Sequence, residues 1–434
     1  MKFGRSLGFL AALVSALCIG GLLSVAVTSK SYSESYPAVV CPPTLAGLTS
    51  QISLASKKTP FQRLQNRTTK TAPVKVLRLP VNKDSLLFSS DGVTPVVWQS
   101  RASSWAGGAV CTGPEASQWF VGGTADITTR GRLIIINSGL SDAVVDVQSF
   151  TENGKQPLRT ITVVSKNYQV IPTDSLAPGD KYLTVHVAPR SGRINAFMID
   201  EQGAGLKSLG GDLVNSVSNA SKSVMIPAIP HQIKDRSPAL PHTLRVLTPG
   251  DVDASVTAEV MSSDGVFVPV GLTSRTVSAG IVTEFQFTPK ISSTVLAVRI
   301  TSTEPVVAAV KSTVTVAGRK DFVWSTSAPE LVPLTIAISG LTPLVSFVGE
   351  RINVSLDVTL TNGKVVRKTI KGTEIATWRA PDAARSFTIT KVGPDTFAGA
   401  LVSSVNGYGY FPIASGSLLT KIELPDSNIR VLNP

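Results

Sequence analysis

The sequence predicts an all-β protein in which three tandem immunoglobulin-like β-sandwich units follow one N-terminal transmembrane or signal helix. The first observation is composition: 43% of the 434 residues are hydrophobic and only 16% are charged, with valine, serine and threonine abundant. This bias favours half-buried pleated sheets over amphipathic helices and argues against a disordered chain. The other two observations are an uncharged N-terminal run and a strand-and-turn pattern that occurs three times.

The chain is long enough for two to four domains, each with its own core. We expect a signal anchor or signal peptide at 1–29, a basic extracytoplasmic stalk at 30–85, a first sandwich with a cysteine- and tryptophan-rich cap at 86–205, a linker and second sandwich at 206–327, and a third sandwich with C-terminal strands at 328–434. The linker stretches are rich in proline, glycine and serine, and a short helix is expected near 209–220.

The N-terminal helix is predicted from the run Leu7 to Val27, which carries no charge. At 1.5 Å per residue this run is about 30 Å long, enough to cross the hydrocarbon core of a bilayer. Lys2 and Arg5 precede it, so we expect the N-terminus inside and the rest of the chain outside. Two interpretations stay open: an uncleaved anchor, which makes a single-pass protein of the cell membrane, or a signal peptide cleaved after Ala26, which secretes the chain.

The segment that follows is basic. Between residues 35 and 83 the chain has no Asp or Glu, and its cations include Lys57, Lys58, Arg63, Arg67 and Lys70. One interpretation is a solvated linker after the membrane. The other is electrostatic adhesion to an anionic cell-wall polymer or to outer-leaflet headgroups.

Cys41 and Cys111 both lie on the expected exported side. An even number of cysteines in an oxidising compartment favours a disulfide. In the chain-entropy model, closing this long loop stabilises the fold by roughly 4 kcal/mol. Free or otherwise paired thiols are the alternative. Neither cysteine has a histidine nearby in the sequence, so a metal site is not expected here.

The strongest structural signal is an internal repeat. The turns Asn153-Gly154, Asp264-Gly265 and Asn362-Gly363 each follow an alternating strand, and such dipeptides are typical of tight hairpins. Aligning the turns superposes AVVDVQS, ASVTAEV and INVSLDV, with the inward positions in the same parity. These positions are Ala143, Val145 and Val147; Ala254, Val256 and Ala258; and Ile352, Val354 and Leu356.

Each repeat continues with further short strands separated by Gly, Pro, Asp and Ser turns. About six strands in roughly 100 residues is the pattern of an immunoglobulin-like sandwich. The Cys…Trp…Cys signature of true immunoglobulin domains is absent from the sequence, so the expectation concerns the architecture alone.

Motifs for catalysis or metal binding are missing from the sequence. It contains no nucleophile elbow, zinc-protease helix, phosphate-binding loop or dinucleotide fingerprint. His186 alternates with valines and is interpreted as a strand residue, while His231 and His242 lie in a proline-rich linker without further ligands at metal-binding spacing. We therefore predict no catalytic residue, no metal and no cofactor.

Aromatic side chains are concentrated between Trp98 and Phe120, a stretch that also holds Trp105, Trp119 and Cys111. One interpretation is a disulfide-tied cap that packs against the first sandwich. The other is a binding surface, with Trp98, Trp105, Trp119 and Phe120 forming an aromatic platform for sugar rings or a partner protein.

Several phrases carry a resemblance to a known family: the apolar start, Cys41-Pro42-Pro43, Cys111-Thr112-Gly113-Pro114 and LIIINSGLSDAVVDVQSFTENG. On these the chain resembles actinobacterial signal-anchored secreted proteins of unknown function, over most of its exported part. Members of that family look like envelope proteins whose genes neighbour a membrane glycosyltransferase. The resemblance implies a role in envelope biogenesis and supplies no catalytic residue.

The function expected from the sequence is a non-catalytic extracytoplasmic envelope protein that binds a cell-wall polymer or scaffolds a membrane complex. Its expected partners are an anionic wall polymer or glycan, the membrane through residues 7–27, and a membrane protein. Nucleic acid is not expected, although the net charge is +12, because the chain is predicted to be exported. The alternative is a carbohydrate-active enzyme with a carboxylate pair that the sequence does not reveal.

Overall fold

The structure, a computed structural model, describes residues 12–15, 18, 39–56, 58–66, 68–73, 75–89, 92–205, 207–233 and 240–417. The chain divides into two compact units, one formed by residues 1–36 with 420–434 and the other by residues 37–419. In the first unit, residues 12–15 and 18 are helical. The predicted span Leu7 to Val27 lies otherwise outside the described residues, as does the cleavage site after Ala26. None of the helical residues that the structure describes forms a segment long and apolar enough to cross a membrane.

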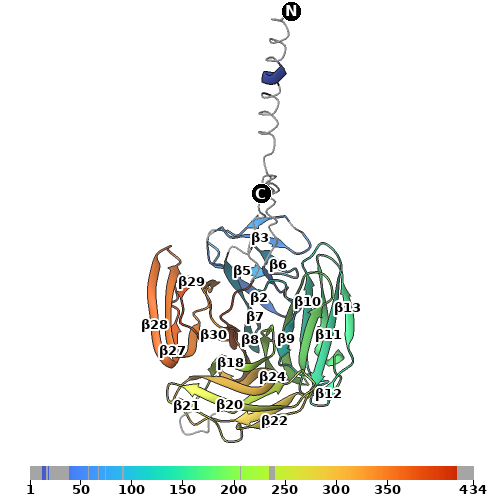
Figure 1. The fold of residues 1–434 in the computed structure, drawn as a ribbon, viewed down its shortest axis with the longest axis vertical. Coiled ribbons are helices and arrows are strands. Elements are labelled where there is room, and N and C mark those ends of the chain that lie inside the picture. The colour runs from blue at the N-terminus through green and yellow to red at the C-terminus, as the bar shows by residue number, and fades with distance from the viewer. Residues whose placement is uncertain are drawn as a thin grey trace, which may run out of the picture. The chain divides into compact units, whose positions relative to one another are not determined.

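The second unit confirms the all-β prediction, since its described residues form strands and a single turn of 3-10 helix (Figure 1). Its first part consists of eight strands: β1 (Val39–Cys41), β2 (Thr49–Ser53), β3 (Pro60–Arg63), β4 (Lys70–Thr71), β5 (Arg78–Val81), β6 (Leu86–Phe88), β7 (Val93–Arg101) and β8 (Trp105–Val110). Strands β1, β6, β3 and β4 form a small sheet, whereas β5, β2, β7 and β8 belong to a larger one.

These strands correct the expectation of a stalk, because the described residues between 39 and 88 fold into a core instead of extending as a linker. Leu54, Leu64 and Leu79 are buried and pack with Ile134 and Phe197, which lie more than fifty residues further along the chain. Among the described basic residues, Lys58, Lys70, Lys75 and Lys83 are exposed, and Arg63 and Arg78 are half-buried. The lack of Asp and Glu in this stretch therefore reflects the solvent-exposed basic side chains of a folded segment and does not indicate an unfolded linker.

The first repeat, as we call residues 118–214, contains two sheets that enclose a common core. One sheet has the order β12-β11-β15-β9, with β13 also on β11, and the other has the order β14-β10-β16-β17. Its elements are β9 (Gln118–Val121), β10 (Arg132–Asn137), β11 (Ala143–Thr151), β12 (Gly154–Lys155), β13 (Arg159–Val163), β14 (Asn167–Pro172), η1 (Thr173–Ser175), β15 (Thr184–Pro189), β16 (Ile194–Ala204) and β17 (Lys207–Val214).

The second repeat, residues 221–326, is one eight-stranded sheet that folds around its own core. The long strand β24 links its two halves: residues 295–306 pair with β18 and β20, and residues 307–316 pair with β19 and β25. Its strands are β18 (Ser221–Pro230), β19 (His242–Leu247), β20 (Ala254–Ser262), β21 (Gly265–Phe267), β22 (Arg275–Val277), β23 (Thr283–Phe287), β24 (Val295–Val316) and β25 (Arg319–Thr326).

The third repeat, residues 334–412, continues into the N-terminal strands, because β26 pairs in parallel with β7. Val96 and Trp98 of β7 accordingly belong to its core. The prediction that both residues belong to the first sandwich, at 86–205, is therefore wrong: the pairing of β7 with β26 makes them part of the core of the third repeat. The strands of this repeat are β26 (Leu334–Ala337), β27 (Leu344–Leu360), β28 (Val365–Arg379), β29 (Ala384–Lys391), β30 (Phe397–Ser403) and β31 (Tyr408–Pro412).

One pairing pattern occurs three times. In the first repeat β11 lies between β13 and β15, and β15 also pairs with β9. Likewise β10 lies between β14 and β16, and β16 also pairs with β17. In the second repeat β20 lies between β22 and β24, and β24 also pairs with β18. In the same way β19 lies between β23 and β24, and β24 also pairs with β25. In the third repeat the long strands β27 and β28 pair along both halves. One half of β27 also pairs with β29, which pairs with β26, and the other half pairs with β30, which pairs with β31.

The predicted alternation is confirmed in all three repeats. The nine inward positions are at most 2% exposed: Ala143, Val145, Val147, Ala254, Val256, Ala258, Ile352, Val354 and Leu356. The glycines of the three turns have φ of +102° at Gly154, +120° at Gly265 and +90° at Gly363. The glycine alone takes the left-handed conformation. The helix expected near 209–220 is not formed: these residues belong to β17, to the connection after it and to the approach to β18.

Candidate functional site

The aromatic platform predicted from the sequence does not exist as a surface. Trp98 and Trp119 are 7% and 8% exposed, and Trp105 and Phe120 are 0% and 1% exposed. Trp119 stacks on His186 with ring centroids 3.9 Å apart, and Trp105 is part of the core that contains both disulfide cysteines. Trp98, Trp105 and Trp119 belong to three different cores and form no common binding surface, whereas Phe120 packs in the core of the first repeat and also lines the cavity described below.

The glycines around these tryptophans explain why the rings are buried. A Cβ atom on Gly211 of β17 would lie 2.9 Å from the Trp105 ring, and one on Gly409 of β31 would lie 2.6 Å from the Trp98 ring. Strands β8, β17 and β31 can therefore approach one another only with glycine at these points. A cluster of tryptophan and glycine marked a close junction of strands.

The predicted basic residues do not converge. Lys57 and Arg67 lie outside the described residues, Lys58 and Lys70 are exposed, and Arg63 is half-buried at the end of β3. Of the described residues, Lys58 lies in a turn before β3, Arg63 ends β3 and Lys70 begins β4.

The disulfide between Cys41 and Cys111 is confirmed, with the two Cα atoms 4.6 Å apart. It connects the end of β1 to the residue after β8. Next to it Val40 and Thr112 exchange backbone hydrogen bonds of 2.8 and 3.2 Å. The bond therefore holds the start of the segment Thr112–Ser117, which leads into the first repeat.

A cavity with a volume of about 680 Å³ begins at this segment. Its walls include the connections between the repeats, at residues 112–117, 215–219 and 327–330, and residues 413–417 after β31, together with residues of strands that include β8, β16, β17 and β18. Both hydroxyl or amide side chains and apolar side chains line the cavity. The hydroxyl and amide group includes Thr112, Ser117, Ser216, Ser218, Asn219, Ser223, Ser327 and Ser415, and the apolar group includes Phe120, Val224, Met225, Val332 and Phe397.

Two glutamates line the same cavity. Burial raises the pKa of Glu115 above its usual value, although the hydroxyl of Ser218, 3.1 Å away, donates a hydrogen bond to its carboxylate and lowers the pKa in part. Glu330 accepts a hydrogen bond of 2.9 Å from the backbone N–H of Asp395. The cavity therefore has neutral hydroxyl-bearing walls and one carboxyl group that takes up a proton more readily than usual.

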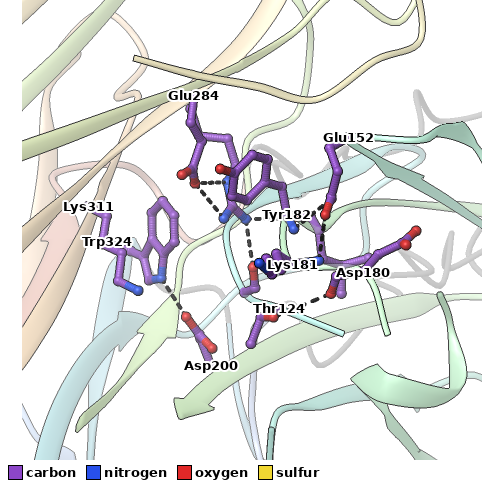
Figure 2. A network of polar contacts seen from close by, with 12 residues as sticks. Thr124, Glu152, Asp180, Lys181, Tyr182, Asp200, Glu284, Lys311 and Trp324 are labelled. Atoms are coloured by element: carbon purple, nitrogen blue, oxygen red, sulfur yellow. Dashed lines mark hydrogen bonds and ion pairs between the residues drawn. The ribbon is translucent and has the colours of Figure 1, made fainter. Parts of the chain in front are cut away.

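Elsewhere in the second unit, a buried polar network joins the first two repeats (Figure 2). Arg245 of β19 donates hydrogen bonds to the carbonyl oxygens of Gly123 and Leu183, at 2.7 and 2.8 Å, and forms an ion pair of 2.7 Å with Glu284. Its guanidinium also lies 4.7 Å from the ring of Trp324. One arginine of the second repeat thus satisfies two carbonyl groups of the first.

Three aspartates extend this network between the first two repeats. Asp200 accepts a 2.8 Å bond from the Trp324 indole, and Asp212 accepts a 2.7 Å bond from the Trp324 backbone N–H. Burial raises the pKa of Asp212 well above its usual value and that of Asp321 to about 7. Because all three are at most 3% exposed, they hold strands together and are closed to a substrate.

The structure brings together two histidines that the sequence places in a linker. His231 Nδ1 lies 3.0 Å from His242 Nε2, and His242 Nδ1 lies 2.8 Å from the hydroxyl of Ser312. Both imidazoles are 1% exposed. Within the part of the chain that the structure describes, no group of three His, Cys, Asp or Glu residues could hold a metal ion.

Sequence reasoning missed the cavity, because its walls come from four segments far apart in the chain. The signal that could have indicated them is the position of each segment, directly after the last strand of a repeat or just before the first strand of the next one.

Comparison with known proteins gives one match. A family model described as a family of unknown function, DUF5719, matches residues 99–372, which agrees with the expected resemblance to an uncharacterised family. No curated protein matches the chain. The matched residues include β10 to β25 and three of the four cavity-lining connections.

Proposed function

The chain belongs to DUF5719, a family of unknown function, and from this starting point we propose that it is a non-catalytic envelope protein that binds a glycan segment of the cell wall in the 680 Å³ cavity. The observation that carries the proposal is the composition of the cavity walls. A sugar presents both hydroxyl groups and apolar C–H faces, and walls that combine hydroxyl and amide groups with apolar side chains complement both.

Three immunoglobulin-like sandwiches, on this proposal, act as a rigid frame that holds the cavity open. The support is the repeated strand pairing and the buried network of Arg245, Trp324 and the aspartates. Connections anchored at both ends by packed repeats lose little conformational entropy when a ligand binds.

Binding is tested on a glycan array that carries wall-type oligosaccharides, with the purified full-length chain. We expect binding that the substitution Val332→Trp abolishes, because Val332 lines the cavity and is 47% exposed, so a larger side chain can fill the space. Val270→Trp is the matched control, at a fully exposed valine outside the cavity, and should bind as the unaltered chain does. Binding that survives Val332→Trp would place the glycan elsewhere, and an array with no signal would end the proposal.

The proposed location is the outer face of a cell membrane, with residues 7–27 as a single-pass anchor, in an actinobacterial type of envelope. The disulfide supports an oxidising compartment, because such bonds persist mainly outside the cytosol. Protease treatment of intact cells should digest the chain, and a mass measurement of its N-terminus should find residue 1 or 2. Loss of residues 1–26 would instead indicate a secreted protein cleaved after Ala26.

The alternative function is a carbohydrate-active enzyme. The observation that favours it is the presence of Glu115 and Glu330 in one cavity, since glycosidases use two carboxyl groups and the general acid needs a raised pKa. A hydrolysis assay on the sugars that bind separates the two: turnover that Glu115→Gln removes supports the enzyme, and binding without turnover supports the envelope binding module.

A further inference from the structure

A second and smaller cavity, of about 300 Å³, lies between the N-terminal segment and the first repeat. Three arginines, Arg101, Arg130 and Arg132, line it together with one glutamate, Glu201. The remaining lining is apolar and includes Leu45 and Val170. None of the functions considered above uses a cavity lined by apolar side chains and several arginines.

Strand geometry brings these side chains to one face. Arg132 is the first residue of β10, Arg130 lies two residues before it, and both side chains line the cavity. Glu201 lies opposite Arg130, whose backbone N–H donates a 2.8 Å bond to the Glu201 carbonyl. Arg132 is paired with Ile199 of β16, which is two residues before Glu201 and therefore on the same face.

The carboxylate of Glu201 forms an ion pair with Arg101. The two form a fork of 2.7 and 2.9 Å contacts, and the glutamate side chain is only 4% exposed. Arg101 also reaches the carbonyl oxygen of Gly47, at 3.3 Å. A Cβ atom at Gly47 would lie 2.6 Å from the Arg101 guanidinium, so glycine at this position lets the loop from Leu45 to Leu48 close one side of the cavity.

Arg130 and Arg132 keep their charge available. Neither takes part in an ion pair with any residue that the structure describes, and the one hydrogen bond found for the Arg132 side chain goes to the neighbouring Gly131 carbonyl. Three arginines less one glutamate leave the cavity with a net charge of +2. A phosphate monoester carries about −1.5 to −2 near pH 7 and presents three acceptor oxygens, which match two guanidinium forks.

From this geometry we propose that the cavity binds a phosphate monoester, with Arg130 and Arg132 on the phosphate and the apolar lining under the group that carries it. Two sources offer this chemistry, a sugar phosphate in solution and the headgroup of a phosphorylated lipid. The site is separate from the glycan cavity, so the two proposals stand or fall independently.

The test is calorimetric titration of the full-length chain with glucose 1-phosphate and with glucose, and flotation with vesicles of phosphatidylcholine with and without phosphatidic acid. We expect glucose 1-phosphate or phosphatidic acid to bind, neutral glucose not to bind, and the affinity to fall as salt is added. The double substitution Arg130→Ala and Arg132→Ala should weaken binding about tenfold or more. Which of the two ligands binds identifies the source.

Arg351→Ala is the matched control, because Arg351 is an exposed arginine in β27 outside both cavities, and it should leave the affinity within about twofold. Arg130→Ala alone, at an exposed side chain, serves where the double substitution lowers the melting temperature. Failure of both phosphate ligands to bind, binding of glucose as strong as that of glucose 1-phosphate, or equal affinity in the double variant would overturn the proposal.

Discussion

At the scale of single residues, two buried groups give the fold opposite responses to pH. Burial and the neighbouring His231 lower the pKa of His242 from 6.5 to about 3. Burial raises the pKa of Asp321 from 3.8 to about 7, although backbone N–H groups and Arg319 lower it in part. In both cases the folded state disfavours the charged form, and the difference from the unfolded chain determines how stability changes with pH.

For His242 the unfolded chain binds a proton below pH 6.5 and the folded chain does so only near pH 3. Stability is therefore lost as pH falls through this window, by at most about 1.4 kcal/mol per pH unit. The substitution His242→Gln, which removes the titration, should flatten this loss. Guanidinium unfolding at pH 4, 5, 6 and 7 measures it, and an unchanged pH profile in the variant would contradict the buried neutral imidazole.

For Asp321 the sign is reversed, because the folded chain keeps its proton up to about pH 7. The stabilisation of the fold by the protonated Asp321 carboxyl is complete below pH 3.8. This stabilisation is lost as the pH rises to 7, again by at most about 1.4 kcal/mol per pH unit. Asp321→Asn retains the acceptor for the Gly211 and Phe322 N–H groups but cannot ionise. We expect stability that rises more steeply with pH between 4 and 7 than in the unaltered chain. Circular dichroism melts would refute this if the two pH profiles coincide.

At this scale the sequence predicted the disulfide partners and the parity of the strand residues, but not the surroundings of Trp105 or His242. Parity follows from the alternation of a strand and is therefore local. The burial of Trp105 depends on glycines such as Gly211, more than a hundred residues later in the chain, and no local pattern carries that information.

At the scale of elements, the Cys41–Cys111 bond connects β1 to the cavity wall across 70 residues. A loop of this length corresponds to about 4 kcal/mol in the chain-entropy model. We predict that changing both cysteines to serine lowers the free energy of unfolding by about this amount, measured in guanidinium. The exposed Cys18, changed to serine, is the control. Equal stability of the double variant and the unaltered chain would show that the bond closes a loop already ordered in the unfolded state.

The strands between residues 39 and 88 show why the basic composition of this segment led to a wrong prediction of a stalk. Residues 39–88 carry many charges of one sign, which is usual for linkers, yet their apolar residues are spaced for short strands that pack on the first repeat. Two- to five-residue strands give too few periods for alternation to be recognised. Strands β17 and β18, of 8 and 10 residues, lie where a linker with a short helix is expected, for a different reason: each is exposed at its start and continuously buried after it, so its side chains do not alternate.

At the scale of the whole molecule, the second unit is bound together by cores that cross the repeats. Val307, Phe322 and Trp324 of the second repeat belong to the core of the first, and Val96 of β7 belongs to the core of the third. A repeat that lost its neighbours would expose these apolar groups to water. Each repeat therefore depends on the others for stability.

Differential scanning calorimetry of the chain should accordingly show one cooperative transition and not three. Trp324→Ala should lower the stability of the whole transition by about 3–5 kcal/mol, because it empties a buried site shared by two repeats. Val365→Ala, at a half-exposed valine in β28, should leave the transition almost unchanged. Three separate transitions, or a Trp324→Ala effect confined to one of several, would show that the repeats unfold independently.

From its sequence alone this protein is determined to be a β-protein with three copies of one strand pattern and a disulfide, because alternation, turns and cysteine number act over a few residues or by simple count. The tertiary structure decided that β7 belongs with the third repeat, that the tryptophans are interior, and that two cavities exist. Each of these depends on which distant strands lie side by side, and that choice is made by the burial of apolar surface over the entire chain.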